Sequence, residues 1–115
     1  MRLVVVIDDD EAVAEVVAAL LKAHGFATKV ALSGSDGLRL IRETLPDAVV
    51  CDMRMPEIGG HEVTLMLKAQ PATSHIPIVL VTGDCDAEYV GMGDAFLRKP
   101  LFARELVGAL DQLAA

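Results

Sequence analysis

The sequence predicts an α/β domain in which a five-stranded parallel sheet is covered by helices on both faces. Short runs of β-branched and other aliphatic residues alternate with segments whose apolar residues recur at helical spacing. The runs are almost continuously apolar, which is typical of strands buried on both faces of a parallel sheet. The connections are short, as in repeated strand–helix units that wind around one sheet.

The first predicted strand and the first predicted helix follow one another directly. Residues 3–7 form a β-branched run that ends in acidic residues and predicts a strand. In residues 11–24 the apolar side chains recur every three or four positions, which predicts a helix. Asp9 or Asp10 can cap its start, and Gly25 can end it.

The same order of elements repeats in the next part of the chain. A short strand is predicted over residues 27–31. A pair that resembles a capping box, Ser33 and Asp36, predicts the start of a second helix, which ends before Pro46. A buried strand over residues 48–51 follows, and it again ends at an acidic residue.

The second half of the chain is less regular. Residues 83–93 are rich in Gly and Asp and carry only a weak helical pattern. The other elements expected here are a loop over residues 53–60, a helix around residues 63–67, strands over residues 78–81 and 95–97, and a last helix marked by Leu106, Leu110 and Leu113.

Composition and charge argue against several classes of protein. The 115 residues fit one domain, residues 1–115. No apolar run approaches the ~20 residues that span a bilayer, and the N-terminal one is too short for a signal peptide, so we expect a cytoplasmic protein without membrane contact. A net charge of −7 without a basic stripe argues against direct nucleic-acid binding. Cys51 and Cys85 are expected to be free thiols.

Polar residues follow four of the five predicted strands. Asp8 and Asp9 come after the first strand, Asp52 after the third, Thr82 after the fourth and Lys99 after the fifth. Because ligands of such sheets bind at the carboxyl ends of the strands, these side chains are predicted to converge at one edge.

The chemistry of these residues suggests a metal-assisted phosphoryl acceptor. Three adjacent carboxylates repel one another unless a cation lies among them. Mg²⁺ prefers such oxygen ligands and keeps positions open for water or phosphate; Mn²⁺ could replace it. Asp52 could then act as a nucleophile toward phosphorus, with Lys99 and the Thr82 hydroxyl supplying charge and hydrogen bonds.

Over essentially its whole length, the sequence resembles a receiver domain of two-component response regulators. The matching segments are residues 6–10, residues 52–56 with Gly60 eight positions after the aspartate, residues 82–83, and residues 96–100. Each segment alone is weak evidence for the resemblance, but four segments in the right order are strong evidence. The resemblance implies a flavodoxin-like, doubly wound fold with strand order 2-1-3-4-5.

The resemblance also implies a role for each matched residue. Asp52 is expected to take a phosphoryl group from a sensor histidine kinase or a histidine phosphotransfer protein. Asp8, Asp9 and the Arg54 backbone carbonyl are expected to bind Mg²⁺ together with Asp52. Lys99 and Thr82 are expected to bind the phosphoryl oxygens.

The expected output of the domain is a change in protein contacts. Phe96 is the aromatic residue expected to change rotamer together with Thr82, which would signal to a downstream protein target. The bond between Lys99 and Pro100 is typically cis in this family. Such a domain is not an enzyme beyond promoting its own phosphorylation and dephosphorylation.

Two positions qualify the resemblance. The interval from Thr82 to Lys99 is more than a helical turn shorter than usual. The helix between the fourth and fifth strands is therefore expected to be short, irregular or absent, so the docking modes of that face cannot be carried over. Gly83 stands where Ala is commoner, and it still leaves room for a phosphoryl group.

A sharper hypothesis concerns Arg54 and Asp84, each two positions after a matched site residue. These positions tune the lifetime of the phosphoryl group in the family. Their opposite charges predict that they approach each other across the pocket mouth and hinder attacking water.

Other interpretations remain open at this stage. Asp8 and Asp10 lie two positions apart, as in magnesium-dependent aspartyl-phosphate phosphatases, although no cap domain is evident. A metal-free pseudo-receiver that acts only in docking is a third possibility. Asp10 can serve as a helix cap and Phe96 as a core residue.

Overall fold

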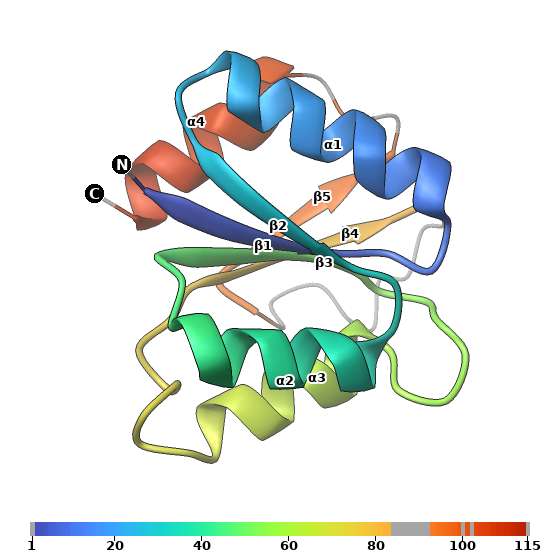
Figure 1. Cartoon of the computed structure of the whole chain (residues 1–115), viewed down its shortest axis with the longest axis vertical. Coiled ribbons are helices and arrows are strands. Elements are labelled where there is room, and N and C mark those ends of the chain that lie inside the picture. Colours follow the sequence, from blue (N-terminus) through green and yellow to red (C-terminus); the bar gives the residue numbers. More distant parts are fainter. Residues whose placement is uncertain (1, 84–92, 100, 102, 115) are drawn as a thin grey trace.

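The computed structural model describes residues 2–83, 93–99, 101 and 103–114 (Figure 1). Its elements are β1 Leu3–Ile7, α1 Glu11–Ala23, β2 Ala27–Ala31, α2 Gly34–Thr44, β3 Ala48–Asp52, α3 Gly60–Lys68, β4 Ile78–Thr82, β5 Ala95–Arg98 and α4 Ala103–Leu113. Cys85, Pro100 and the helix expected between the fourth and fifth strands lie outside these residues. No helix in the described part of the chain combines the length and apolar character needed to cross a bilayer.

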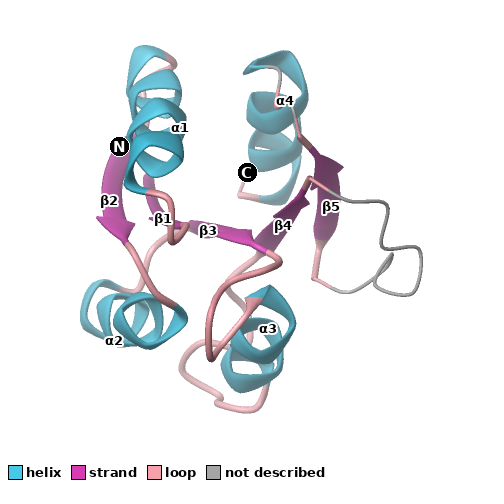
Figure 2. Cartoon of the chain, turned by 90° about the vertical axis from the view of Figure 1, so that its right-hand side faces the viewer, coloured by secondary structure: helices cyan, strands magenta, loops and turns pink. Residues whose placement is uncertain are grey.

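The five strands form one parallel sheet in the order β2-β1-β3-β4-β5. Helices α1 and α4 cover one face of the sheet, and α2 and α3 cover the other (Figure 2). This confirms the predicted doubly wound architecture. The fold therefore brings the carboxyl ends of β1, β3 and β4 together at one edge, which is where the candidate site residues were expected.

Two apolar clusters, one on each face of the sheet, make up the core. Val5 and Ile7 of β1 face α2 and α3, whereas Val4 and Val6 face α1 and α4. This alternation follows from the period of two along a strand. It also places Cys51 on the α2 and α3 face, buried, as a free thiol.

The helix boundaries follow the predicted capping signals. Asp10 caps α1, with its carboxylate accepting a hydrogen bond from the Val13 amide at 3.3 Å. Gly25, at φ 90°, follows the C-cap of α1, and such a left-handed conformation favours glycine. The Ser33 hydroxyl accepts a hydrogen bond from the Asp36 amide at 3.1 Å and caps α2.

Three strands extend one residue beyond the prediction. The ladder between β3 and β4 includes Asp52, which pairs with Val81, and the ladder between β4 and β5 pairs Thr82 with Arg98. The polarity of these residues suggested that the strands had ended, but backbone pairing continues regardless of side-chain type. Asp52 and Thr82 are thus held by the sheet rather than by a loop.

Candidate functional site

Three carboxylates converge at the edge where β1 and β3 end. Oxygen atoms of Asp8, Asp9 and Asp52 all lie within 4.8 Å of one another. The parallel pairing of Ile7 with Cys51 explains this proximity, because the next residue along each strand is an aspartate. The sequence prediction that these three acids converge is confirmed in the coordinates.

Asp8 is the most enclosed of the three acids, with only 8% of its side chain exposed. One carboxylate oxygen accepts a hydrogen bond from the Asp10 amide at 2.9 Å. The other lies 3.5 Å from the ammonium nitrogen of Lys99. Asp9, by contrast, is exposed.

Lys99 reaches into the acidic cluster from the end of β5. Its backbone amide donates a hydrogen bond to the Thr82 carbonyl at 2.7 Å, which fixes the start of the side chain at the sheet edge. Its ammonium nitrogen lies 3.5 Å from Asp8 Oδ2 and 3.7 Å from Asp52 Oδ1. The ammonium group is thus shared between two carboxylates.

The environment of Asp52 opposes its negative charge. Burial raises the pKa of its carboxyl above the ordinary value, and the Asp8 carboxylate raises it further. The Lys99 ammonium lowers this pKa, Asp9 raises it, and a hydrogen bond from the Arg54 backbone amide lowers it. Because the net shift of the Asp52 pKa is upward, the positive charge of Lys99 does not fully offset burial and the neighbouring carboxylates.

The donor set fits a hard divalent cation. Three carboxylates and one ammonium leave two negative charges without a partner in the cluster, which equals the charge of one such ion. All the side-chain ligands are oxygen atoms, which Mg²⁺ prefers to nitrogen or sulfur. The acidic cluster is therefore compatible with a metal site.

Thr82 and Phe96 lie on the same face of the sheet. Thr82 ends β4 with 1% of its surface exposed. Phe96 pairs with Leu80, two residues before Thr82, and packs partly buried against the core on the α2 and α3 side. The two residues thus lie on adjacent strands of one face, and their coupled rotamer change stays a prediction.

The loop after β3, residues 53–59, contributes backbone groups to the site. The Arg54 amide donates to the Asp52 carboxylate, whereas the Arg54 side chain is exposed. Asp84, the expected partner of Arg54, lies outside the described residues. Sequence reasoning did not find the contact between the Asp10 amide and Asp8, nor the support of this loop by Glu62. The spacing of Glu62, three residues after the N-cap Gly59, was the available signal for the second contact.

Comparison with known proteins identifies the family. The family model of the response regulator receiver domain matches residues 4–111. The DNA-binding response regulator MtrA of Mycolicibacterium smegmatis is 36% identical over 109 residues, which cover 90% of this chain and 46% of MtrA. The polar-differentiation response regulator DivK of Brucella ovis is 34% identical over 103 residues, covering 85% of this chain and 84% of DivK.

Solved structures give the same result. A putative response regulator from Chloroflexus aurantiacus has a TM-score of 0.91 and 31% identity, over 98% of this chain and 97% of that one. The chain spans about half the length of the MtrA proteins that it matches, and the DNA binding in their name is a property of those proteins. Since the family model takes in nearly the whole sheet and its acidic edge, the chain belongs to the receiver domains of two-component response regulators.

Proposed function

We propose that Asp52 accepts a phosphoryl group from the phosphohistidine of a sensor histidine kinase or a histidine phosphotransfer protein. The position of Lys99 supports this most directly, since its ammonium group lies 3.5 Å from Asp8 and 3.7 Å from Asp52. Phosphoryl transfer depends on positioning and on charge compensation, and a carboxylate between a cation and two other acids can provide both.

In the proposed reaction an Asp52 oxygen attacks phosphorus while the bond from phosphorus to the donor histidine nitrogen breaks. The imidazole nitrogen keeps the electron pair and takes up a proton, and the product is an acyl phosphate on Asp52. Lys99 and the Thr82 hydroxyl bind the oxygens of the transferred group. Mg²⁺, held by Asp8, Asp9, Asp52 and the Arg54 carbonyl, supplies further positive charge, and Mn²⁺ can replace it.

The acyl phosphate then changes the surface of the domain. It adds about two negative charges next to Lys99 and Thr82. As Thr82 moves toward the phosphoryl group, Phe96 turns into the space that Thr82 leaves. A complete inversion of such a two-state equilibrium takes about 5.5 kcal/mol, which a doubly charged group with several hydrogen bonds can supply. A downstream protein binds the altered surface. Residues 1–115 act as one cytoplasmic signalling unit in this proposal, without direct contact with DNA or with a membrane.

Arg54 and Asp84 belong to the same proposal as residues that set the lifetime of the acyl phosphate. Their opposite charges are proposed to hinder the attacking water. Replacing Arg54 with alanine is expected to shorten the half-life of the adduct. An unchanged half-life would contradict this role.

The two rival functions fit the contacts less well. A phosphatase with Asp8 as nucleophile would use Asp10 as its acid, but the Asp10 carboxylate caps α1 and its amide holds Asp8. A pseudo-receiver needs no shared cation, whereas Lys99 lies between Asp8 and Asp52. Beyond its own phosphorylation and dephosphorylation, the domain is therefore proposed to have no catalytic activity.

Acetyl phosphate with Mg²⁺, followed by intact-mass measurement, separates the three functions. We expect one phosphoryl adduct per chain, none in Asp52→Asn, and none when EDTA removes the metal. Turnover of a phosphomonoester that is lost in Asp8→Asn but kept in Asp52→Asn would support the phosphatase. No adduct and no turnover would support the pseudo-receiver.

A further inference from the structure

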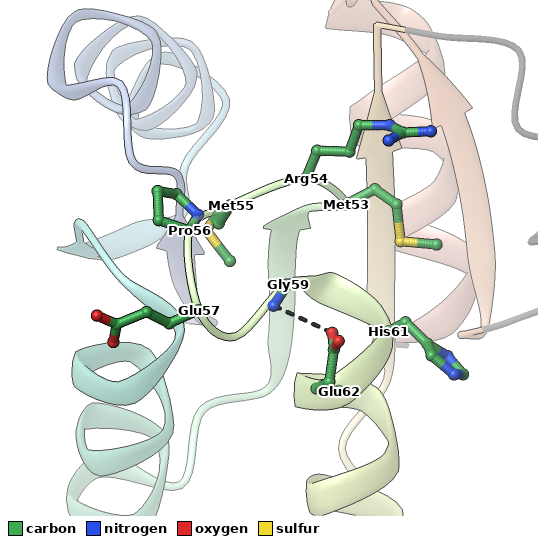
Figure 3. A pocket seen from close by; sticks show the side chains of 8 residues that line it. All are labelled: Met53, Arg54, Met55, Pro56, Glu57, Gly59, His61 and Glu62. Atoms are coloured by element: carbon green, nitrogen blue, oxygen red, sulfur yellow. Dashed lines mark hydrogen bonds between the residues drawn. The ribbon is translucent and has the colours of Figure 1, made fainter.

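The loop over residues 53–59 packs on the core through Met53, Met55 and Ile58 and also borders a pocket. It runs from the end of β3 to the start of α3 and carries Arg54 next to Asp52. A cavity of about 450 Å³ lies against the loop (Figure 3), lined by Met53, Arg54, Met55, Pro56, Glu57, Gly59, His61 and Glu62. Because the loop borders this open space, the hydrogen bonds at its ends add to the apolar contacts that hold its conformation.

Both ends of the loop meet at the first turn of α3. The Gly60 amide donates a hydrogen bond to the Met53 carbonyl at 3.0 Å. A Cβ atom at Gly59 would lie 2.7 Å from the Met53 carbonyl oxygen, and one at Gly60 would lie 2.9 Å from the Asp52 carbonyl oxygen. The start of α3 therefore rests directly on the backbone of the residues that end β3.

Gly59 is the N-cap of α3, but it has no side chain with which to cap the helix. Glu62 provides a hydrogen bond in its place, since its Oε2 accepts from the Gly59 amide at 3.0 Å (Figure 3). This bond ties the far end of the loop to the helix. In a capping box the N-cap side chain and the third helical residue each bond the other's backbone amide. Here only the bond from the Gly59 amide to Glu62 is present, because glycine has no side chain.

Two further features bear on the conformation of the loop. Glu57 has φ 66°, a left-handed conformation that is unfavourable for a residue with a Cβ atom. On the other side, a Cβ atom at Gly34 would lie 2.6 Å from the Ile58 carbonyl oxygen, so the start of α2 is closely packed against the loop. The backbone is thus strained at Glu57, whereas Ile58 is held by its contact with α2 and Gly59 by its bond to Glu62.

We propose that Glu62 is a positioning residue for the acceptor site. By holding the Gly59 amide, its carboxylate keeps the loop in the one conformation that presents the Arg54 backbone to Asp52 and to a bound cation. If the bond is lost, only a fraction of the molecules has the loop in place, and the apparent affinity for the cation falls by that fraction. This role rests on the proposed function of Asp52 and its metal site.

The test measures Mg²⁺ binding without a phosphodonor, by amide-resolved NMR titration of the whole chain. Loss of an N-terminal helix bond costs about 1 kcal/mol, which predicts Mg²⁺ binding weakened by at most about fivefold in Glu62→Ala, the limit that applies when the loop is mostly out of place. Glu62→Gln keeps an oxygen acceptor and is expected to bind within about twofold of the wild type. Glu62→Asp keeps the charge but is shorter by one methylene, so it is expected to weaken binding, and it replaces Glu62→Ala if that variant does not fold.

Glu43→Ala is the matched control, since Glu43 is an exposed glutamate in α2 and makes no ion pair or hydrogen bond with the described residues. It should leave Mg²⁺ binding unchanged. Hydrogen exchange of the Gly59 amide gives a second readout, and it should be accelerated in Glu62→Ala but not in Glu43→Ala.

The outcomes distinguish this inference from the proposed function. Wild-type Mg²⁺ affinity in Glu62→Ala and Glu62→Asp, or unchanged exchange of the Gly59 amide, would overturn the positioning role. Equal weakening in Glu62→Gln and Glu62→Ala would also overturn it, because charge and not the bond would be responsible. A wild-type chain that binds Mg²⁺ but never forms an adduct on Asp52 would refute only the proposed function. A wild-type chain that does not bind Mg²⁺ would refute both.

Discussion

Replacing Asp52 with asparagine is expected to stabilise the domain in the absence of divalent cations. The substitution keeps the shape of the side chain and an oxygen that can accept the hydrogen bond from the Arg54 amide. It removes a charge whose side chain is only 11% exposed. A change at the proposed phosphoryl acceptor should therefore make the fold more stable.

The magnitude follows from the charges around Asp52. Repulsion from Asp8, with oxygens up to 4.8 Å away, amounts to about 1 to 3.5 kcal/mol for dielectric constants of about 80 to 20. Attraction to Lys99 at 3.7 Å amounts to about 1 to 4.5 kcal/mol over the same range. These two contributions nearly cancel, so burial decides the outcome. We expect Asp52→Asn to gain about 1 to 2 kcal/mol, or about 3 to 10 °C in Tm.

The pH dependence of this gain has a definite sign. The folded-state pKa of Asp52 is raised, so protonation of Asp52 favours the folded state. The resulting stability is fully present below the ordinary aspartate pKa of about 3.9 and is lost as the pH rises through the raised value. The advantage of Asp52→Asn over the wild type should therefore be largest near neutral pH and shrink toward acidic pH.

Urea denaturation with EDTA, at several pH values between about 4 and 7, measures this difference. Asp111→Asn is the control, because Asp111 is 53% exposed and pairs with Arg2 at 2.6 Å at the surface. That substitution should be neutral or slightly destabilising. Equal or lower stability of Asp52→Asn near pH 7, or an advantage that does not change with pH, would refute the reasoning.

Three further predictions follow from particular contacts. Glu57→Gly should raise the free energy of unfolding by about 1 kcal/mol in urea denaturation, because glycine adopts the left-handed conformation of φ 66° without strain; a loss of stability would contradict this. Gly60→Ala should destabilise the fold by about 1 to 3 kcal/mol and so lower Tm, because its Cβ atom would lie 2.8 Å from Leu80 and 2.9 Å from the Asp52 carbonyl oxygen. An unchanged Tm would contradict this and show that the backbone can move. Cys51 should react with iodoacetamide only after unfolding, since burial raises the pKa of its thiol, and mass mapping of native labelling at Cys51 would disprove this.

Much of the fold could be predicted because each face of the sheet imposes a simple pattern. The continuous apolar run of β1 follows from burial on both faces, and the caps at Asp10 and Ser33 are local signals. The ends of β3 and β4 were placed one residue early, since backbone pairing does not depend on side-chain polarity. Boundaries set by hydrogen bonds to a neighbouring strand leave no mark in the local sequence.

The candidate site, too, has a part that could be predicted from the sequence and a part that could not. The convergence of Asp8, Asp52 and Lys99 follows from topology alone, because each lies at or just after the end of a strand. The support of the neighbouring loop by Glu62 and Gly34 depends on how helices pack against that loop. The Glu62 bond spans only three residues and had a signal in its spacing from the N-cap, whereas the contact of Gly34 with Ile58 joins residues far apart in the chain and has no pattern in a single sequence.

The feature that makes the site predictable also makes it unfavourable for stability. Parallel strands that end side by side bring Asp8 and Asp52 together, although 44 positions separate them in the sequence. A fold selected for stability alone would place neutral or opposite charges there. An uncompensated acidic edge is instead expected where the missing charge comes from a ligand, because binding then relieves a repulsion already present in the free protein. The stability gained by Asp52→Asn would thus measure the cost of the Asp52 charge, which a bound cation is proposed to offset.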